Sequence, residues 1–155
     1  MSFIGQFQAK LDCKNRVFLP AVFRRSLQSN GDEAVSLVVR KDFFENCLVV
    51  YPESQWMSEV EKVRSRLNRF DASQQMVYRK LVSEAQQVFL DGNGRLLLPK
   101  SLLDKVGIEQ DVLFVGMEQT IEVWAPLSAA ADGDGNDTFM CDADFAEGIK
   151  AFMTE

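Results

Sequence analysis

Hydrophobic and polar positions follow the same pattern twice along the chain. The stretch LDCKNRVFLP at residues 11–20 places a polar turn before an apolar run that ends at a proline. The stretch LDGNGRLLLP at residues 90–99 repeats this arrangement 79 positions later. Because residues 7–27 align with residues 86–106 without a gap, the pattern predicts two homologous halves within one chain.

Each half is predicted to fold as a strand, a tight turn, a second strand, a short helix and a further pair of strands. Asn15 and Gly94 occupy the same position in the two turns, and both residue types tolerate the left-handed backbone conformation of a tight hairpin. The apolar run after each turn favours a strand. Pro20 and Pro99 then fit the first turn of a helix, where the missing N–H of proline costs nothing.

Two helices are predicted between the halves. In the first, apolar residues recur at the i, i+4, i+7 and i+11 positions of a helix of about four turns. These residues are Trp56, Val60, Val63 and Leu67. The second helix is predicted to start at Asp71, a good N-cap residue, and to have Met76, Val77 and Leu81 on its apolar side. We expect both helices to link and cover the two sheets.

The end of the chain differs from the repeated part. Residues 127–138 are rich in Gly, Asp and Ala, and they predict a mobile linker because too few apolar groups offset the entropy of ordering. The stretch DADFAEGIKAFM then predicts a short acidic helix with Phe145, Ile149 and Phe152 on one side. The expected organisation is a first domain at residues 1–52, a helical connector at 53–84, a second domain at 85–126 and an acidic flexible tail at 127–155.

The composition narrows the class of function. The chain has no histidine, which removes Ser-His-Asp and Cys-His catalysis, and its three cysteines form no CxxC pair. We therefore expect no enzyme, no metal or other cofactor and no small-molecule substrate. No apolar run approaches the roughly 18 residues that a membrane span requires, and the N-terminus lacks the layout of a secretory signal, so a cytoplasmic protein without a membrane partner is expected.

Charge is distributed unevenly along the chain. Residues 132–155 contain seven acidic residues against Lys150, so this segment alone accounts for the net charge of −6. Residues 1–27 contain five basic residues against one acid, Asp12. Positive charge is thus concentrated around the first turn, and the acidic tail is a candidate competitor of any anionic partner of the basic turns.

The two turns carry the candidate chemistry. Each places an aspartate four residues before an arginine, Asp12 with Arg16 and Asp91 with Arg95. A single motif of this kind is explained by closure of the hairpin alone, but an arginine kept in both copies of a turn favours contact with a partner. The planar guanidinium fork matches phosphate oxygens or the O6/N7 edge of guanine, and the aspartate is expected to orient it.

The order of FIGQFQAKLDCKNRVFLPAVFR, LVVYPESQW, LDGNGRLLLPKSLL and IEVWA resembles the MraZ family of bacterial transcriptional regulators over roughly residues 3–126. This resemblance implies an α+β fold, mainly β, in which two AbrB-like (SpoVT-AbrB) swapped-hairpin β-barrel units are related by a pseudo-twofold axis and joined by a helical connection. It also implies a nucleoid-associated protein, commonly a repressor, that forms a homo-oligomeric ring. Its expected partner is double-stranded DNA with direct repeats upstream of the division and cell-wall gene cluster.

Carried onto this sequence, the resemblance makes Arg16 and Arg95 the DNA contacts. The predicted DNA-binding residues are Asp12, Lys14, Asn15, Arg16, Asp91, Asn93 and Arg95, with Lys10 and Arg24 as further candidates for contact with the DNA backbone. Asn15 stands where the family usually has glycine, which is a mild change because asparagine tolerates positive φ. Asn93 replaces Lys14 in the second turn, so we expect the first turn to bind phosphate more strongly.

One chain offers about three basic groups on its turns, and a few phosphate contacts give weak, salt-sensitive binding. Several chains fixed in one ring raise the affinity by about 10²–10⁴ without new types of contact. DNA with repeated boxes therefore suits an oligomer that displays several copies of the turns. The alternative is an oligomeric scaffold whose turns bind protein carboxylates and which does not bind DNA.

Overall fold

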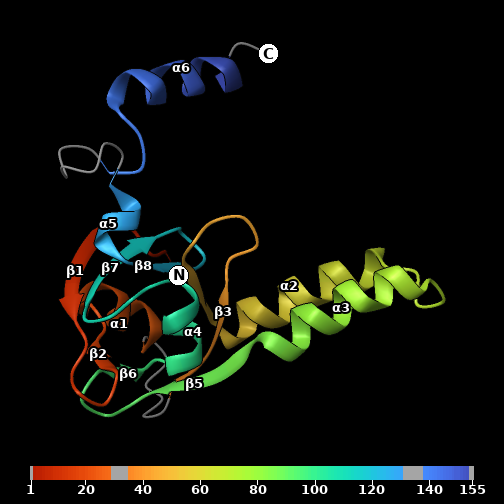
Figure 1. Ribbon diagram of the computed structural model, residues 1–155, viewed down its shortest axis with the longest axis horizontal. Coiled ribbons are helices and arrows are strands. Elements are labelled where there is room, and N and C mark those ends of the chain that lie inside the picture. Colours follow the sequence, from red (N-terminus) through yellow and green to blue (C-terminus); the bar gives the residue numbers. More distant parts are fainter. Residues whose placement is uncertain (1, 29–34, 131–137, 154–155) are drawn as a thin grey trace.

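The computed structural model describes residues 2–28, 35–130 and 138–153 of the chain. Within these residues one antiparallel sheet curls into a nearly closed barrel, and a helical hairpin projects from it (Figure 1). The first half contains β1 (Gln6–Lys10), β2 (Arg16–Phe18), α1 (Ala21–Leu27), β3 (Val35–Lys41) and β4 (Leu48–Pro52). The second half contains β5 (Gln86–Leu90), β6 (Arg95–Leu97), α4 (Lys100–Lys105), β7 (Asp111–Gly116) and β8 (Ile121–Trp124). The remaining helices are α2 (Glu53–Arg66), α3 (Ala72–Glu84), α5 (Pro126–Ala129) and α6 (Asp142–Met153).

Pairs of strands from the two halves alternate around the barrel. Their order is β1-β7-β8-β4-β3-β5-β6-β2, and β2 also contacts β1, which brings the two ends of the sheet together. Strands β1, β2, β3 and β4 each pair with a strand of the second half. Exchanging the halves leaves this order unchanged, so the predicted α+β, mainly β fold with pseudo-twofold duplication is confirmed. The predicted limits of the domains stay a prediction.

The barrel interior is filled by alternate residues of each strand. In β2 the inward-facing Val17 is buried, whereas Phe18 points outward and is exposed. The N-terminal Phe3 is fully buried and packs edge-to-face on Phe23 of α1, with 5.5 Å between ring centroids. Aromatic pairs of this kind bury a large apolar area in a defined geometry, so they anchor the N-terminus and α1 to one core.

The two predicted turns have the expected backbone. Asn15 has a φ of 63° and Gly94 a φ of 84°, which confirms the left-handed conformation at this position of both copies. The expectation for the prolines is wrong by one residue, because Pro20 and Pro99 precede helices that begin at the next position. Both prolines have extended ψ angles, so each one ends the strand segment and lies outside the first helical turn.

Helices α2 and α3 form as predicted, but they cover less of the sheet than expected. The Asp71 side chain caps α3 by accepting a hydrogen bond from the Gln74 backbone N–H over 3.1 Å. Only the base of the hairpin packs on the barrel, through residues such as Trp56. Met76 and Val77, predicted on the apolar side of α3, are about 60% exposed because the hairpin extends away from the barrel (Figure 1).

The end of the chain is more structured than expected. The predicted linker is wrong for its first residues, since α5 packs Ala129 into a buried cluster with Cys47 and Trp124. Residues 131–137 of that linker lie outside the described residues. Helix α6 forms as predicted, but no residue of it is buried. Among the described helices, none is long and apolar enough to cross a membrane.

Gly116 provides a test of this packing. A Cβ atom at Gly116 would lie 2.4 Å from the carbonyl oxygen of Phe3, a backbone contact that cannot give way without moving the buried N-terminus. We expect Gly116→Ala to lower the free energy of unfolding by about 2 kcal/mol or more. Gly92→Ala is the matched control, because no atom of the described residues lies within 4 Å of its Cβ position. Urea unfolding measures both, and equal stabilities of the two variants would contradict the packing described.

Candidate nucleic-acid interface

The first turn is built around the side chain of Asp12. Its Oδ1 atom accepts hydrogen bonds from the backbone N–H groups of Lys14 and Arg16, each over 2.9 Å. The Asp12 backbone N–H donates to the Arg16 carbonyl oxygen over 2.8 Å, and the Asn15 N–H donates to the Asp12 carbonyl over 3.0 Å. An aspartate that satisfies the turn amides in this way favours the hairpin locally.

The second turn repeats this geometry around Asp91. Its Oδ1 atom accepts from the N–H groups of Asn93 and Arg95 over 2.9 and 2.8 Å. In both turns the second carboxylate oxygen accepts from the arginine Nε, over 2.9 Å for Asp12 and Arg16 and 3.2 Å for Asp91 and Arg95. Each aspartate therefore fixes the direction of its arginine and leaves the two terminal Nη groups for another partner.

The barrel brings the two arginines to the same outer face. Strands β2 and β6 pair so that Arg16 lies opposite Leu97 and Phe18 opposite Arg95. The arginines are thus diagonal neighbours across one ribbon, at a backbone separation of about 7–8 Å. Their side chains are 31% and 25% exposed, so they lie neither inside the fold nor on opposite sides of it.

Reciprocal backbone hydrogen bonds fix the two turns relative to each other. The Leu19 N–H donates to the Gly94 carbonyl oxygen, and the Leu98 N–H donates to the Asn15 carbonyl oxygen, each over 3.0 Å. Each bond thus joins the left-handed residue of one turn, Gly94 or Asn15, to the residue that follows the strand of the other half, Leu19 or Leu98. The spacing of the arginines is therefore set by the barrel and does not depend on the flexibility of either turn.

Three exposed apolar side chains on the outer face of β2, β5 and β6 were not predicted as part of the site. Phe18, Phe89 and Leu97 are each more than half exposed on the outer face, and the Arg95 guanidinium carbon lies 5.9 Å from the centroid of the Phe18 ring. This distance is within the range of a cation–π contact. The signal was present in the alternation of the strands, because Phe18 lies between two inward-facing residues.

Arg24 lies across the second turn although it belongs to the first half. Its Nε donates to the Leu19 carbonyl oxygen over 3.0 Å, and a Cβ atom at Gly94 would lie 2.5 Å from its Nη1. Gly94 is therefore needed both for its positive φ and for the room that it leaves to Arg24. Arg24 joins the two halves in this structure, and its contact with the DNA backbone stays a prediction.

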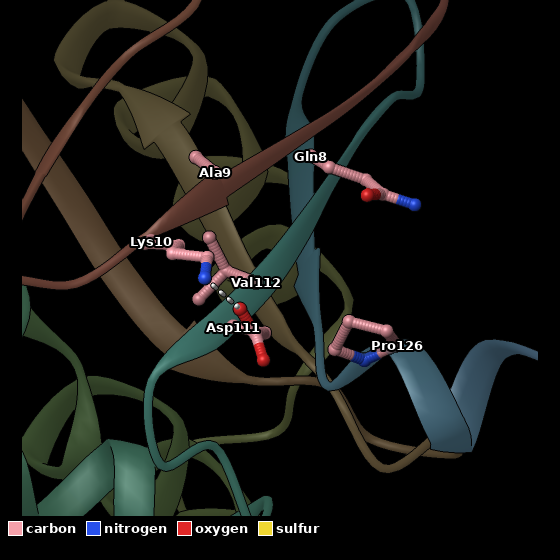
Figure 2. Close-up of a pocket in the computed structure, with 6 residues that line it drawn as sticks. All are labelled: Gln8, Ala9, Lys10, Asp111, Val112 and Pro126. Carbon is pink, nitrogen blue, oxygen red and sulfur yellow. Dashed lines mark ion pairs between the residues drawn. The ribbon is translucent and has the colours of Figure 1, made fainter.

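Lys10 lines a shallow cavity over the paired strands β1 and β7, beside the start of α5 (Figure 2). Its Nζ is 3.9 Å from Asp111 Oδ1 across the two strands, and both side chains are largely exposed. The cavity has a volume of about 370 Å³ and is also lined by Gln8 and Pro126. Within the described ranges, no group of three or more His, Cys, Asp or Glu side chains has the arrangement of a metal site.

Both turn aspartates stay ionised at neutral pH. The hydrogen bond from the Arg16 backbone N–H is the largest cause that holds the pKa of Asp12 below its ordinary value, and the Lys14 N–H and the Arg16 guanidinium act in the same direction. The Arg95 backbone N–H does the same for the pKa of Asp91. An ionised carboxylate keeps each guanidinium in place under the conditions in which a nucleic acid would bind.

The fold and the site define a class of protein: a pseudo-dimeric swapped-hairpin β-barrel, made by duplication within one chain, that displays two Asp–Arg turns on one face. A family model described as "MraZ protein, putative antitoxin-like" matches residues 2–80 and 81–127. The chain belongs to the MraZ family. The tail after residue 127 lies outside this match.

Curated relatives agree with this assignment. A protein of Bacteroides fragilis is 47% identical over 123 residues, which cover 79% of this chain and 77% of the relative. A protein of Phocaeicola vulgatus is 42% identical over 153 residues, or 99% and 94% of the two chains. A protein of Cytophaga hutchinsonii is 35% identical over 124 residues, or 80% of each. Each of these relatives is named "Transcriptional regulator MraZ".

The contribution of the turn aspartates' charge to the stability of the fold can be tested by varying the pH. Asp12→Asn combined with Asp91→Asn keeps an oxygen that accepts from the turn amides but removes the charge that holds each arginine. Because the pKa of both aspartates is lowered on folding, their charge stabilises the fold above the ordinary value of about 3.9, and this stabilisation is lost as the pH falls through the lowered pKa. Urea unfolding should show the wild type to be more stable at pH 7, with the difference closing below about pH 4. A difference that persists or widens in acid would argue against this role.

Proposed function

We propose that this protein is a sequence-specific DNA-binding regulator of transcription that reads double-stranded DNA with its two Asp–Arg turns. The observation that carries the proposal is the position of Arg16 and Arg95 on one outer face, each with its Nε held by an aspartate. Two guanidinium groups that are oriented in advance pay little further entropy on binding. The names of the relatives support the same class of function.

In this mechanism the two arginines read bases and Lys14 binds phosphate. The Nη groups of Arg16 and Arg95 donate in pairs to the O6/N7 edge of guanine in the major groove, where a good bidentate contact discriminates by about 1–3 kcal/mol. Lys14 is exposed at the tip of the first turn and neutralises the backbone. Phe18 projects beside Arg95 and can contact the methyl group of thymine.

Assembly supplies the affinity that one chain lacks. The cations of the two turns are largely balanced by Asp12 and Asp91, so a single chain neutralises few phosphates. We propose that several chains form a ring, that the ring engages direct repeats as linked events, and that it acts as a repressor upstream of the division and cell-wall gene cluster. This places the protein in the cytoplasm at the nucleoid.

The exposed Phe18, Phe89 and Leu97 favour a second candidate, an oligomeric scaffold that binds proteins. In that case the two arginines would pair with carboxylates of a protein partner, and DNA would not compete for them. The two experiments that follow separate this alternative from the proposed regulator.

Arg16→Ala combined with Arg95→Ala tests DNA binding directly. Fluorescence anisotropy with a duplex that carries repeated boxes from upstream of the protein's own gene should show binding that weakens with rising salt. The double variant should bind about 100-fold more weakly or worse, because each arginine contact contributes about 1–3 kcal/mol. Lys100→Ala combined with Lys105→Ala removes the same charge from exposed positions of α4 and should change little. Equal affinity of both variants, in proteins that still assemble, would favour the scaffold.

The cysteines provide an independent footprint. Cys13 is exposed in the first turn, Cys141 lies far from it in the chain, and Cys47 is buried. Burial raises the pKa of Cys47 to about 12, so this thiol should stay unreactive toward N-ethylmaleimide in the folded protein. A saturating duplex should slow the alkylation of Cys13 several-fold and leave that of Cys141 unchanged, as followed by mass spectrometry. Unchanged labelling of Cys13 would place DNA away from the first turn.

A further inference from the structure

Helix α6 has an apolar side that is largely exposed among the described residues. Phe145, Ile149 and Phe152 follow helical spacing and are 57%, 45% and 81% exposed. The same helix begins with Asp142 and Asp144 and carries further acidic charge. A helix of this length is marginal in water on its own, because most helical stability in proteins comes from packing of an amphipathic side. A partner surface that is apolar and basic would complement this helix.

The far end of the α2–α3 hairpin is such a surface. We call residues 62–80 the hairpin tip. It contains one acidic residue, Asp71, and six basic residues: Lys62, Arg64, Arg66, Arg69, Arg79 and Lys80. Phe70 is 90% exposed there, in addition to Met76 and Val77. A groove of about 310 Å³ opens at the tip, lined by Arg64, Leu67, Arg69, Gln75 and Tyr78.

The charges of the tip are more available than those of the barrel face. At the barrel face each arginine is bound by its own aspartate, and Asp12 and Asp91 would repel an acidic helix. At the tip, Asp71 is used as the N-cap of α3. Arg64 and Lys80 pair with Glu61 and Glu84, but across the described residues Lys62, Arg66 and Arg69 form no ion pair. Of the two basic surfaces, the tip therefore offers α6 the stronger electrostatic match.

We propose that helix α6 of one chain docks on the hairpin tip of a second copy of this chain. Its apolar side covers the exposed Phe70 and the outer side of α3, and its acidic residues face the arginines of the tip. A second copy is the favoured source because the tip points away from the barrel and α6 lies apart from it (Figure 1). The contact would join two chains at a place away from the barrel. It would use α6, which lies outside the residues that the family model matches.

Cross-linking of the full-length protein tests this contact. Chains labelled with ¹⁵N and unlabelled chains are refolded together from urea and treated with a carbodiimide, which joins a carboxylate directly to an amine. We expect peptides that link Lys62 or Lys80 to Asp142, Asp144 or Glu147 and that pair a heavy with a light chain. Links confined to chains of one label, or links of α6 to Lys10 or Lys14 of the barrel, would overturn the proposal.

Charge reversal separates a specific contact from a general attraction. Arg66→Glu with Arg69→Glu should lower the yield of the mixed-label Glu147 link by about tenfold, and so should Asp142→Lys with Asp144→Lys. Combining all four changes should restore the yield. Lys100→Glu with Lys105→Glu changes the charge equally on α4 and should leave the yield unchanged.

The alternative occupant of the hairpin tip is the DNA backbone. If the tip instead binds phosphate, Arg66→Glu with Arg69→Glu will weaken binding of a random-sequence duplex in the same anisotropy assay and leave the mixed-label links unchanged. That result would overturn the proposal. The cross-links do not depend on DNA, so failure of the proposed regulatory function would leave this test intact.

Discussion

The two halves of this chain are held together by the strands that they exchange, and the pairing of β2 with β6 is the contact that carries the two arginines. Without the exchange, each half would expose unpaired strand edges and would not enclose a core. The same pairing joins the two turns through the bonds at Gly94 and Asn15. The position of the arginines is thus a consequence of barrel closure, so stability of the fold and geometry of the candidate site depend on the same hydrogen bonds.

Much of the fold could be predicted from the sequence because its signals are local. The repeated turn, the positive φ of Asn15 and the cap at Asp71 depend on residues only a few positions apart. The exposure of Met76 could not be predicted in this way, because helical spacing defines which residues share a side of the helix but does not show whether another surface covers that side. The short helix at residues 126–129 packs Ala129 in a cluster with Cys47 and Leu113, which are distant in the chain, so no local pattern shows this contact.

In the candidate site, too, the features set by residues close in sequence could be predicted, and those set by distant contacts could not. The aspartates and arginines were found because their spacing is repeated, and a carboxylate four residues before an arginine has a simple geometric role. Phe18 was assigned to the strand and not to the site, since its outward direction becomes significant only when the paired strand places Arg95 opposite. Arg24 was predicted as a candidate for contact with the DNA backbone, and its position was not foreseen: its Nε donates to the Leu19 carbonyl oxygen, and its side chain lies against the turn of the other half.

Fusion of the two halves into one chain permits the two turns to differ. Lys14 in the first turn corresponds to Asn93 in the second, and Cys13 corresponds to Gly92. Two identical subunits related by a true twofold axis look the same from either direction along a double helix, so they suit palindromes. A fused pair with unequal turns has a leading end and a trailing end. Under the proposed function, successive chains can therefore bind along the DNA in the same orientation.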